Sequence, residues 1–522
     1  MPRLCLLLVL AVTKVSGDPL PQPFWPVEYY VSETPADNVG FSNNDMFLLH
    51  HARVTHFWEP TKTGPIFFYC GHELPLEDYI NNTGLLWNWA KEFKAMIIFS
   101  EHRFYGQSLP DDTVPYLNYF SALQALADYA HLILHIKETV HRADKVPVIA
   151  FGGFYGGMLA AYFRLKYPHL IAGALASSAP VQMFPGLVPC SAFDHTLTKA
   201  FRRESAACAK AIRKSWPHLL SLTDSKRKAH EFSRKYKMCD NLTTQAQRML
   251  LDWMHDTYLH LAMYNYPEPS SRLTSLPVNP VKEACSLLTK AKSNASLVDA
   301  VFKVMNLFFN HTGTHDCLQI LFYVNLNPAW HFQTCTELVM AHCSDGVADM
   351  FFTRNWDMKQ MRHTCKKRFR VKPDPQKIYS MFGNRLETSS NIIFSNGELD
   401  PWSAVGYRAP KTKSVIPILI RGAAHQEDFR FPSLTDSAAL IRARWEEKKY
   451  VRKWIDEAGS DEGITVLFDH GDGKTRDAEA RDRKVPNFVG PDTGTPDVQT
   501  PDTETKDEET PTTSEEYLRH EL

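Results

Sequence analysis

A glycine-rich turn between an apolar run and a helical pattern constrains this chain more than any other feature. The turn is Gly152-Gly153-Phe154-Tyr155-Gly156-Gly157, which follows the strand-like run Val146–Ala150 and precedes the helix-like stretch Met158–Tyr167. A strand, a sharp turn and a helix in this glycine pattern are typical of a G-x-S-x-G nucleophile elbow, which holds a serine exposed on a strained turn. Here Phe154 takes the serine's place. The surroundings therefore predict a serine hydrolase, but a benzyl group cannot attack a carbonyl carbon.

An aspartate and a histidine follow later, each after an apolar, strand-like run. Asp400 comes after Asn391–Ser395, and His425 comes after Ser414–Ile420. The order elbow, aspartate, histidine is that of the α/β-hydrolase triad. In such a triad the histidine is the general base and the aspartate holds its tautomer. Taken singly, Asp400 is a turn residue and His425 is one of 22 histidines, but their order favours a triad without its nucleophile.

The rest of the pattern predicts an α/β fold, specifically an α/β-hydrolase fold with a helical insertion. Short continuous apolar runs, as in buried parallel strands, occur at Ile66–Tyr69, Ala95–Phe99 and Ile171–Ala176. Helical patterns occupy Ala122–Ile136 and the charged stretch Ala438–Ala458. Residues 190–370 are rich in cysteine, and the helix-like pieces there are Ala206–Trp216, Ala246–Tyr264 and Leu297–Phe309.

This pattern divides the chain of 522 residues into six expected parts. They are a signal peptide (1–17), an irregular Pro-rich extension (18–44), the first part of the α/β domain (45–189), a helical insertion (190–370), the second part of the α/β domain (371–458) and a tail (459–522). The tail is polar and acidic with Pro-Asp repeats, so it buries too little apolar surface to offset the entropy of ordering, and we expect disorder there.

Several features indicate the secretory pathway. Arg3, the apolar run Leu4–Val12 and the small residues Val15-Ser16-Gly17 predict a cleaved signal peptide; a buried N-terminal helix is the alternative. The end, Arg519-His520-Glu521-Leu522, resembles the K-D-E-L retrieval signals, although only its last two residues match strictly and chance is the alternative. We therefore expect a secreted, lysosomal or ER-retained protein. N-glycosylation sequons start at Asn81, Asn241, Asn294 and Asn310.

The cysteines also indicate an oxidising compartment. Of ten cysteines, Cys5 leaves with the signal peptide, Cys70 lies alone, and eight lie between Cys190 and Cys365. Eight cysteines in one secreted segment predict four disulfides. A metal site is the alternative, but no C-x-x-C pair occurs, so we expect neither metal nor cofactor.

Charge and hydropathy exclude other classes of function. The formal net charge of −1 gives no general case for binding nucleic acid or a membrane surface. After the N-terminus no apolar run reaches the length of a membrane span. The sequence is compatible with a homodimer as well as with a monomer.

From about Gly64 to Ala458 the chain resembles the serine peptidase family of lysosomal Pro-X carboxypeptidase (prolylcarboxypeptidase) and dipeptidyl peptidase II, and is closer to the former. The motifs that carry the resemblance are Glu101-His102-Arg103-Phe104-Tyr105-Gly106, Gln124-Ala125-Leu126-Ala127-Asp128, the glycine-rich elbow, Lys166-Tyr167-Pro168-His169, Val188-Pro189-Cys190, Gln333-Thr334-Cys335-Thr336-Glu337 and Asn396-Gly397-Glu398-Leu399-Asp400-Pro401-Trp402-Ser403.

This resemblance implies cleavage beside proline, hence proline-containing peptides as partners. It implies a proline pocket lined by Met158, Met340 and Trp402, for which plain core packing is the alternative. It implies an oxyanion hole from the backbone N–H of Tyr155 and one from the loop at Gly71. It also implies the pairs Cys190–Cys343, Cys208–Cys285, Cys239–Cys317 and Cys335–Cys365.

Four departures from the family surround the expected site. Phe154 replaces the serine, Gly71-His72-Glu73-Leu74 stands for Gly-Asn-Glu-Gly, and Ala404-Val405-Gly406 replaces glycines. His425-Gln426-Glu427-Asp428-Phe429-Arg430 stands for His-His-Leu-Asp-Leu-Arg. We therefore expect an inactive peptidase that binds peptides or a partner protein. The alternative is an active exopeptidase with an error or rare allele at position 154.

Three residues are candidates to replace the missing nucleophile. Ser177 and Ser178 follow the next strand, and Cys70 lies near the expected oxyanion loop. We expect the serines to be structural, and we find no base placed for the thiol.

Overall fold

The computed structural model describes most of the chain. The described residues are 25–41, 43–59, 64–110, 116–239, 241–243, 247–270, 272, 274–318, 328–460 and 482–485. The expected signal peptide and the terminal Arg519–Leu522 lie outside these ranges.

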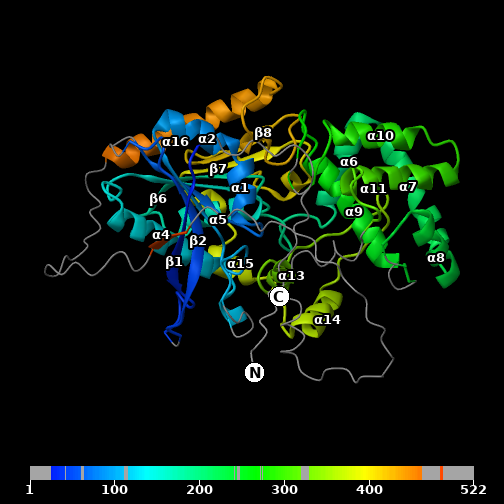
Figure 1. Cartoon of the computed structure of the whole chain (residues 1–522), viewed down its shortest axis with the longest axis horizontal. Coiled ribbons are helices and arrows are strands. Elements are labelled where there is room, and N and C mark those ends of the chain that lie inside the picture. Colours follow the sequence, from blue (N-terminus) through cyan, green and yellow to red (C-terminus); the bar gives the residue numbers. More distant parts are fainter. Residues whose placement is uncertain are drawn as a thin grey trace, which may run out of the picture.

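A nine-stranded sheet forms the centre of the larger half of the molecule (Figure 1). Its spatial order is β8-β7-β6-β5-β3-β4-β2-β1-β9. Strands β3 to β8 pair in parallel, whereas β2 joins β4, β1 joins β2 and β9 joins β1 antiparallel. The strands are β1 Glu28–Pro35, β2 Met46–Val54, β3 Ile66–Cys70, β4 Met96–Ser100, β5 Val148–Gly153, β6 Ile171–Ser177, β7 Ile392–Gly397, β8 Val415–Ile420 and β9 Asp482–Val485.

Helices cover both faces of this sheet, and a group of helices stands beside it (Figure 1). One face packs against α4 and α5, and the other against α1, α2 and α16. The helices are α1 Leu76–Asn82, α2 Gly84–Phe93, α4 Ala122–Thr139, α5 Tyr155–Lys166, α6 Ala192–Glu204, α7 Ala206–Leu222, α8 Lys226–Lys235, α9 Gln247–Met263, α10 Pro280–Thr289, α11 Asn294–Phe309, α13 Pro328–Thr336, α14 Met358–Phe369, α15 Lys377–Phe382 and α16 Ala438–Ser460. Short 3-10 turns lie at Leu117–Tyr119, Leu386–Thr388, Pro401–Val405 and Glu427–Phe429.

The sequence patterns predicted the parallel strands, which are buried along nearly their whole length. The antiparallel edge was missed. The extension 18–44 is not irregular throughout, because Glu28–Pro35 forms β1. The tail also contains a strand, since β9 pairs with Tyr29–Ser32. β9 pairs with β1 from the other end of the chain, and a local pattern does not report such pairing, whereas β1 also pairs along its length with β2, the next strand in the sequence.

Four disulfides tie the helical region together. They are Cys190–Cys343, Cys208–Cys285, Cys239–Cys317 and Cys335–Cys365, the same pairs that the resemblance implied. The helical region also has its own apolar core, formed largely by α6, α7, α9, α10 and α11. The fold is thus an α/β-hydrolase fold with a disulfide-stapled helical part.

Two of the motifs quoted above, those that contain Arg103 and Asp128, share a structural role. Arg103 and Asp128 are both fully buried and form a bidentate ion pair, with Nε–Oδ2 at 2.7 Å and Nη2–Oδ1 at 2.5 Å. The same guanidinium donates to the carbonyls of Pro35, Ala36 and Tyr119. One charged pair therefore fixes together the end of β1, α4 and the 3-10 turn Leu117–Tyr119 that precedes α4.

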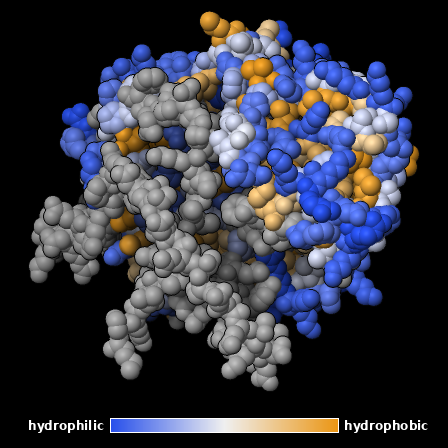
Figure 2. Space-filling view, turned by 45° about the vertical axis from the view of Figure 1, so that its right-hand side comes forward, coloured by the Kyte–Doolittle hydropathy of each residue, from blue (hydrophilic) through white to orange (hydrophobic). Residues whose placement is uncertain are grey.

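On the face shown in Figure 2, hydrophilic residues cover most of the coloured surface and hydrophobic residues are scattered among them. Among the described helices, none is long and apolar enough to cross a membrane.

Candidate functional site

The expected elbow lies where β5 ends and α5 begins. Phe154 occupies the turn with φ 54° and ψ −121°. Its N–H donates to the carbonyl of Ser177 at 2.9 Å, and its carbonyl accepts from Met158 N at 3.1 Å. Positive φ is uncommon for a bulky residue and costs on the order of 1–3 kcal/mol. The turn therefore has the strained geometry of an elbow although its residue is phenylalanine.

The ring of Phe154 is half-buried and surrounded by aromatic rings. Its centroid lies 4.5 Å from that of Trp402, 5.7 Å from that of Trp330 and 6.1 Å from that of His425. The pair with Trp402 is edge-to-face, a favourable aromatic geometry. The benzyl group thus fills space between the histidine and two tryptophans.

His425 and Asp400 form the pair that their order predicted. His425 Nδ1 lies 2.9 Å from Asp400 Oδ2, and both side chains are almost completely buried. Asp400 Oδ1 also accepts from Trp402 N at 3.1 Å. Both residues follow the carboxyl ends of neighbouring parallel strands, β7 and β8, which brings them to one edge of the sheet. The structure therefore unites Phe154, Asp400 and His425.

The second ring nitrogen of His425 faces a side-chain amide. Gln426 Nε2 lies 2.9 Å from His425 Nε2, and Gln426 Oε1 accepts from Arg272 Nη1 at 3.0 Å. The backbone N–H of Gln426 donates to Ser178 Oγ at 3.0 Å. Gln426 is one of the departures from the family pattern, but its contact with the histidine was not predicted.

The three residues expected to line a proline pocket differ in exposure, and Met340 packs against the core cluster that contains Met158 as well as against the cluster that Trp402 contacts. Met158 is completely buried in the core beneath α5. Met340 and Trp402 are half-buried and pack against a common apolar cluster of Met183, Phe193, Ala404 and Val405. Trp330, which belongs to none of the motifs quoted above, packs against the rings of Phe154 and Tyr155. Its tryptophan identity was the only sequence feature that could have drawn attention to it.

The two residues expected at an oxyanion hole lie at the ends of neighbouring strands. Tyr155 is the first residue of α5, and Gly71 follows β3. A Cβ at Gly71 would lie 2.1 Å from the carbonyl oxygen of Ser100, so only glycine fits there. The Tyr155 hydroxyl accepts from Gln333 Nε2 at 2.5 Å and lies 3.0 Å from His102 Nε2. Burial raises the pKa of this hydroxyl well above its usual value, so it stays protonated.

None of the three possible substitute nucleophiles has an activating environment. Ser177 Oγ donates to Asp428 at 2.7 Å, and Ser178 Oγ accepts from the backbone of Gln426. Cys70 is completely buried, and burial raises the pKa of its thiol well above the usual value. A neutral thiol is a poor nucleophile. Both serines are completely buried, and each hydroxyl makes a hydrogen bond within the fold, as a structural role requires.

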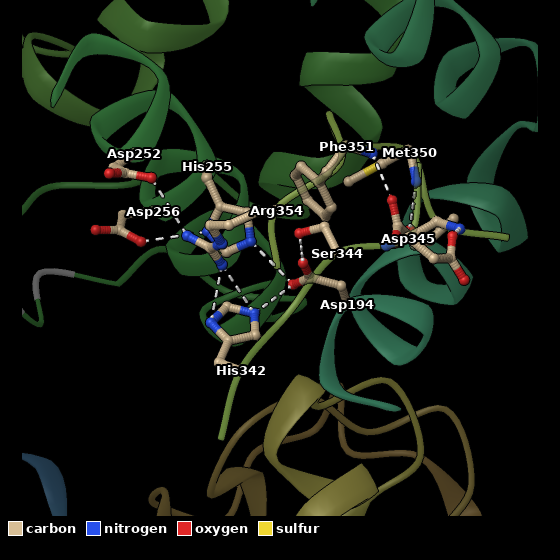
Figure 3. Close-up of polar contacts among 12 residues, drawn as sticks. Asp194, Asp252, His255, Asp256, His342, Ser344, Asp345, Met350, Phe351 and Arg354 are labelled. Atoms are coloured by element: carbon tan, nitrogen blue, oxygen red, sulfur yellow. Dashed lines mark hydrogen bonds and ion pairs between the residues drawn. The ribbon is translucent and has the colours of Figure 1, made fainter. Parts of the chain in front are cut away.

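A second polar cluster lies in the helical region (Figure 3). Asp194 of α6 accepts at Oδ1 from His255 Nε2 and His342 Nε2, each at 2.9 Å, and its other oxygen accepts from Ser344 Oγ. Burial opposes protonation of His255, but the charge of Asp194 outweighs it and raises the pKa of His255 to about 9. The same contacts lower the pKa of Asp194 against the effect of burial.

This cluster offers the donor types of a zinc site, yet its geometry suits a charge network better. Arg354 Nη2 lies 2.9 Å from Nδ1 and 3.1 Å from Nε2 of His342. A guanidinium that close to the ring repels a second cation at the same nitrogen. We interpret the cluster as structural.

Comparison with known proteins gives a consistent match. The family model described as Peptidase_S28, serine carboxypeptidase S28, matches residues 34–447. The lysosomal Pro-X carboxypeptidase of Homo sapiens is 38% identical over 437 residues, which cover 81% of this chain and 88% of that protein. Prolyl carboxy peptidase like protein 5 of Caenorhabditis elegans is 36% identical over 457 residues, covering 81% and 89%.

Among solved structures, the proline iminopeptidase of Mycobacterium smegmatis aligns over 82% of this chain and 98% of its own, at 10% identity and a TM-score of 0.35. At this level the alignment says nothing about chemistry.

Proposed function

Since the chain belongs to the serine carboxypeptidase S28 family, we propose that it is a peptidase-like protein that has lost its nucleophile. Its site would bind proline-containing peptides and leave them uncut. Asp400 and His425 would be the remnants of the triad, and Phe154 would hold the position of the lost serine.

The observation that carries this proposal is the position of Phe154 on the strained turn, with its ring 6.1 Å from that of His425. No oxygen at this position can attack a peptide carbonyl. Removing the serine of a triad lowers kcat by on the order of a millionfold. A phenyl ring should lower kcat further than the loss of the hydroxyl alone, because the ring occupies space that the scissile carbonyl needs.

The site of binding would be the half-buried apolar surface around Phe154. Met340 and Trp402 belong to it, and Trp330 adds a further aromatic face. A flat apolar surface suits a pyrrolidine ring. The complete burial of Met158 favours its alternative role in core packing. The backbone N–H groups of Tyr155 and of the Gly71 loop would be the remnants of the oxyanion hole.

An active exopeptidase is the rival function, with position 154 an error or rare allele. The close contact of His425 with Asp400, at 2.9 Å, supports it, because a base and its orienting acid are in place.

The test is calorimetric titration of the unmodified chain with a Pro-X peptide, followed by mass spectrometry of the same samples. We expect saturable binding and intact peptide. Binding with proline-directed cleavage would establish the rival. Absence of binding would contradict the proposed peptide site.

We place the protein in the secretory pathway, because four disulfides require an oxidising compartment. Asn241 and Asn294 are exposed, and Asn81 and Asn310 are half-buried. All four would therefore be glycosylation sites.

A further inference from the structure

Gln426 has the contacts of a cap on the second nitrogen of His425. A neutral imidazole carries one N–H, and the other nitrogen is an acceptor. The neighbour of Nδ1 is Asp400 Oδ2 at 2.9 Å, a carboxylate that accepts. Nδ1 therefore carries the proton, and Nε2 accepts from the Gln426 amide at 2.9 Å.

Arg272 fixes which end of the amide faces the histidine. A guanidinium only donates, so its Nη1, 3.0 Å from Gln426 Oε1, holds the oxygen end of the amide. The NH₂ end must then point to His425. Arg272 is itself nearly buried, and its Nε lies 3.5 Å from Asp78 Oδ2. A buried charged pair thus sets the orientation of the cap.

The backbone holds the amide against the elbow. Gln426 has φ 50°, and its N–H donates to Ser178 Oγ at 3.0 Å. A Cβ at Gly153 would lie 2.3 Å from Gln426 Oε1. The amide therefore lies directly over the residue that precedes Phe154, beside the histidine.

We propose that Gln426 is a second block on catalysis, independent of Phe154; this inference rests on the proposed function. A serine at position 154 would need to donate its hydroxyl proton to His425 Nε2. That lone pair already accepts from Gln426. A restored serine would therefore find the lone pair of its general base, His425 Nε2, already bonded to the Gln426 amide. Gln426 thus acts as a positioning residue that holds the histidine in an unproductive contact.

A fluorophosphonate tests this without requiring a peptide pocket. The serine oxygen forms a bond to phosphorus, the phosphorus–fluorine bond breaks, fluoride leaves, and the hydroxyl proton passes to His425 Nε2. The proteins compared are Phe154→Ser, Phe154→Ser with Gln426→Ala, and Phe154→Ser with Gln426→His. Phe154→Ser with His425→Ala gives the background, and Phe154→Ser with the exposed Gln376→Ala is the matched control. Mass spectrometry measures the labelling rate.

We expect either change at Gln426 to raise the labelling rate about three- to tenfold over Phe154→Ser, the effect of releasing one hydrogen bond, and Gln376→Ala to leave it unchanged. Because Gln426→Ala and Gln426→His are tested separately, the comparison still holds if one of the two variants fails to fold. Equal rates with and without the Gln426 change, whether fast or at background, would overturn the proposal.

A second readout concerns the hydrogen bond itself. The ¹⁵N resonance of His425 Nε2, identified by its loss in His425→Ala, should shift when Gln426→Ala is introduced into the otherwise unmodified chain. An unshifted resonance would also overturn the proposal. Failure of the proposed function would look different, because it would show in the unmodified chain, as cleavage of the peptide or as absence of peptide binding, and not in the comparison of residues at position 426.

Discussion

At the scale of single residues, Phe154 joins two features that rarely occur together. Its backbone has the positive φ of a nucleophile turn, and its side chain packs edge-to-face on Trp402. For a non-glycine residue this backbone conformation is costly. The hydrogen bond from its N–H to Ser177 O, together with the glycines around it, holds the turn. The surroundings, more than the residue itself, therefore determine the conformation at position 154.

Replacing Phe154 with alanine should open the apolar surface between Trp330 and Trp402. We expect the dissociation constant for a Pro-X peptide to fall roughly fivefold or more, because an aromatic group no longer occupies the site. The loss of packing should lower the free energy of unfolding by about 1–3 kcal/mol. Calorimetry and chemical denaturation measure the two effects. The fully exposed Phe41→Ala is the control, and unchanged peptide affinity would contradict our account of the ring.

At the scale of elements, buried charge holds the irregular edge of the sheet. Arg103 and Asp128 join α4 to the end of β1, and neither side chain reaches solvent. A buried ion pair stabilises the fold little more than a well-packed apolar pair would, but removing one partner leaves an uncompensated buried charge, which is strongly destabilising. The motifs that contain these residues are thus explained by folding and do not require a catalytic role.

Asp128→Asn should therefore destabilise the protein by about 3–5 kcal/mol. Urea denaturation followed by circular dichroism measures the change. The exposed Asp144→Asn serves as the comparison and should leave the free energy of unfolding nearly unchanged. Similar stabilities for the two variants would show that the buried pair is dispensable.

The sequence was informative where local pattern decides structure. The apolar runs that became β3 to β8 were recognisable because buried parallel strands are continuously apolar. The helix-like piece Ala206–Trp216 was expected to end at Trp216, but α7 continues through Pro217 to Leu222, since tertiary packing overrides local propensity. The order of Phe154, Asp400 and His425 predicted their meeting. The contact of Gln426 was not predictable, because it depends on a left-handed backbone and on Arg272, far away in the sequence.

At the scale of the whole molecule, the helical region is anchored by covalent and ionic links. Cys190–Cys343 closes a sequence separation of 153 residues beside the cluster of Asp194, His255 and His342. Phe193 connects this cluster to the site, since its ring lies 5.0 Å from that of His342 and 4.7 Å from that of Trp402. The stability of this region therefore bears on the shape of the apolar site.

The protonation of His255 makes that stability depend on pH. Its folded pKa of about 9 exceeds the ordinary 6.5, so the stabilisation is complete below pH 6.5 and is lost as the pH rises through about 9. Asp194 has a lowered pKa, so its contribution falls only below the ordinary value of 3.8. We expect the free energy of unfolding to decline on the alkaline side. His255→Asn should remove part of that slope in denaturation measured across pH, and an identical slope would contradict the charge network.

The most direct test of the central claim is hydrolysis of a Pro-X peptide by the purified, unmodified chain, with His425→Ala as the background. Mass spectrometry of the products decides the outcome. Our account predicts no cleavage above that background, because Phe154 offers no nucleophile. Proline-directed cleavage that a serine-reactive phosphonate abolishes would contradict it.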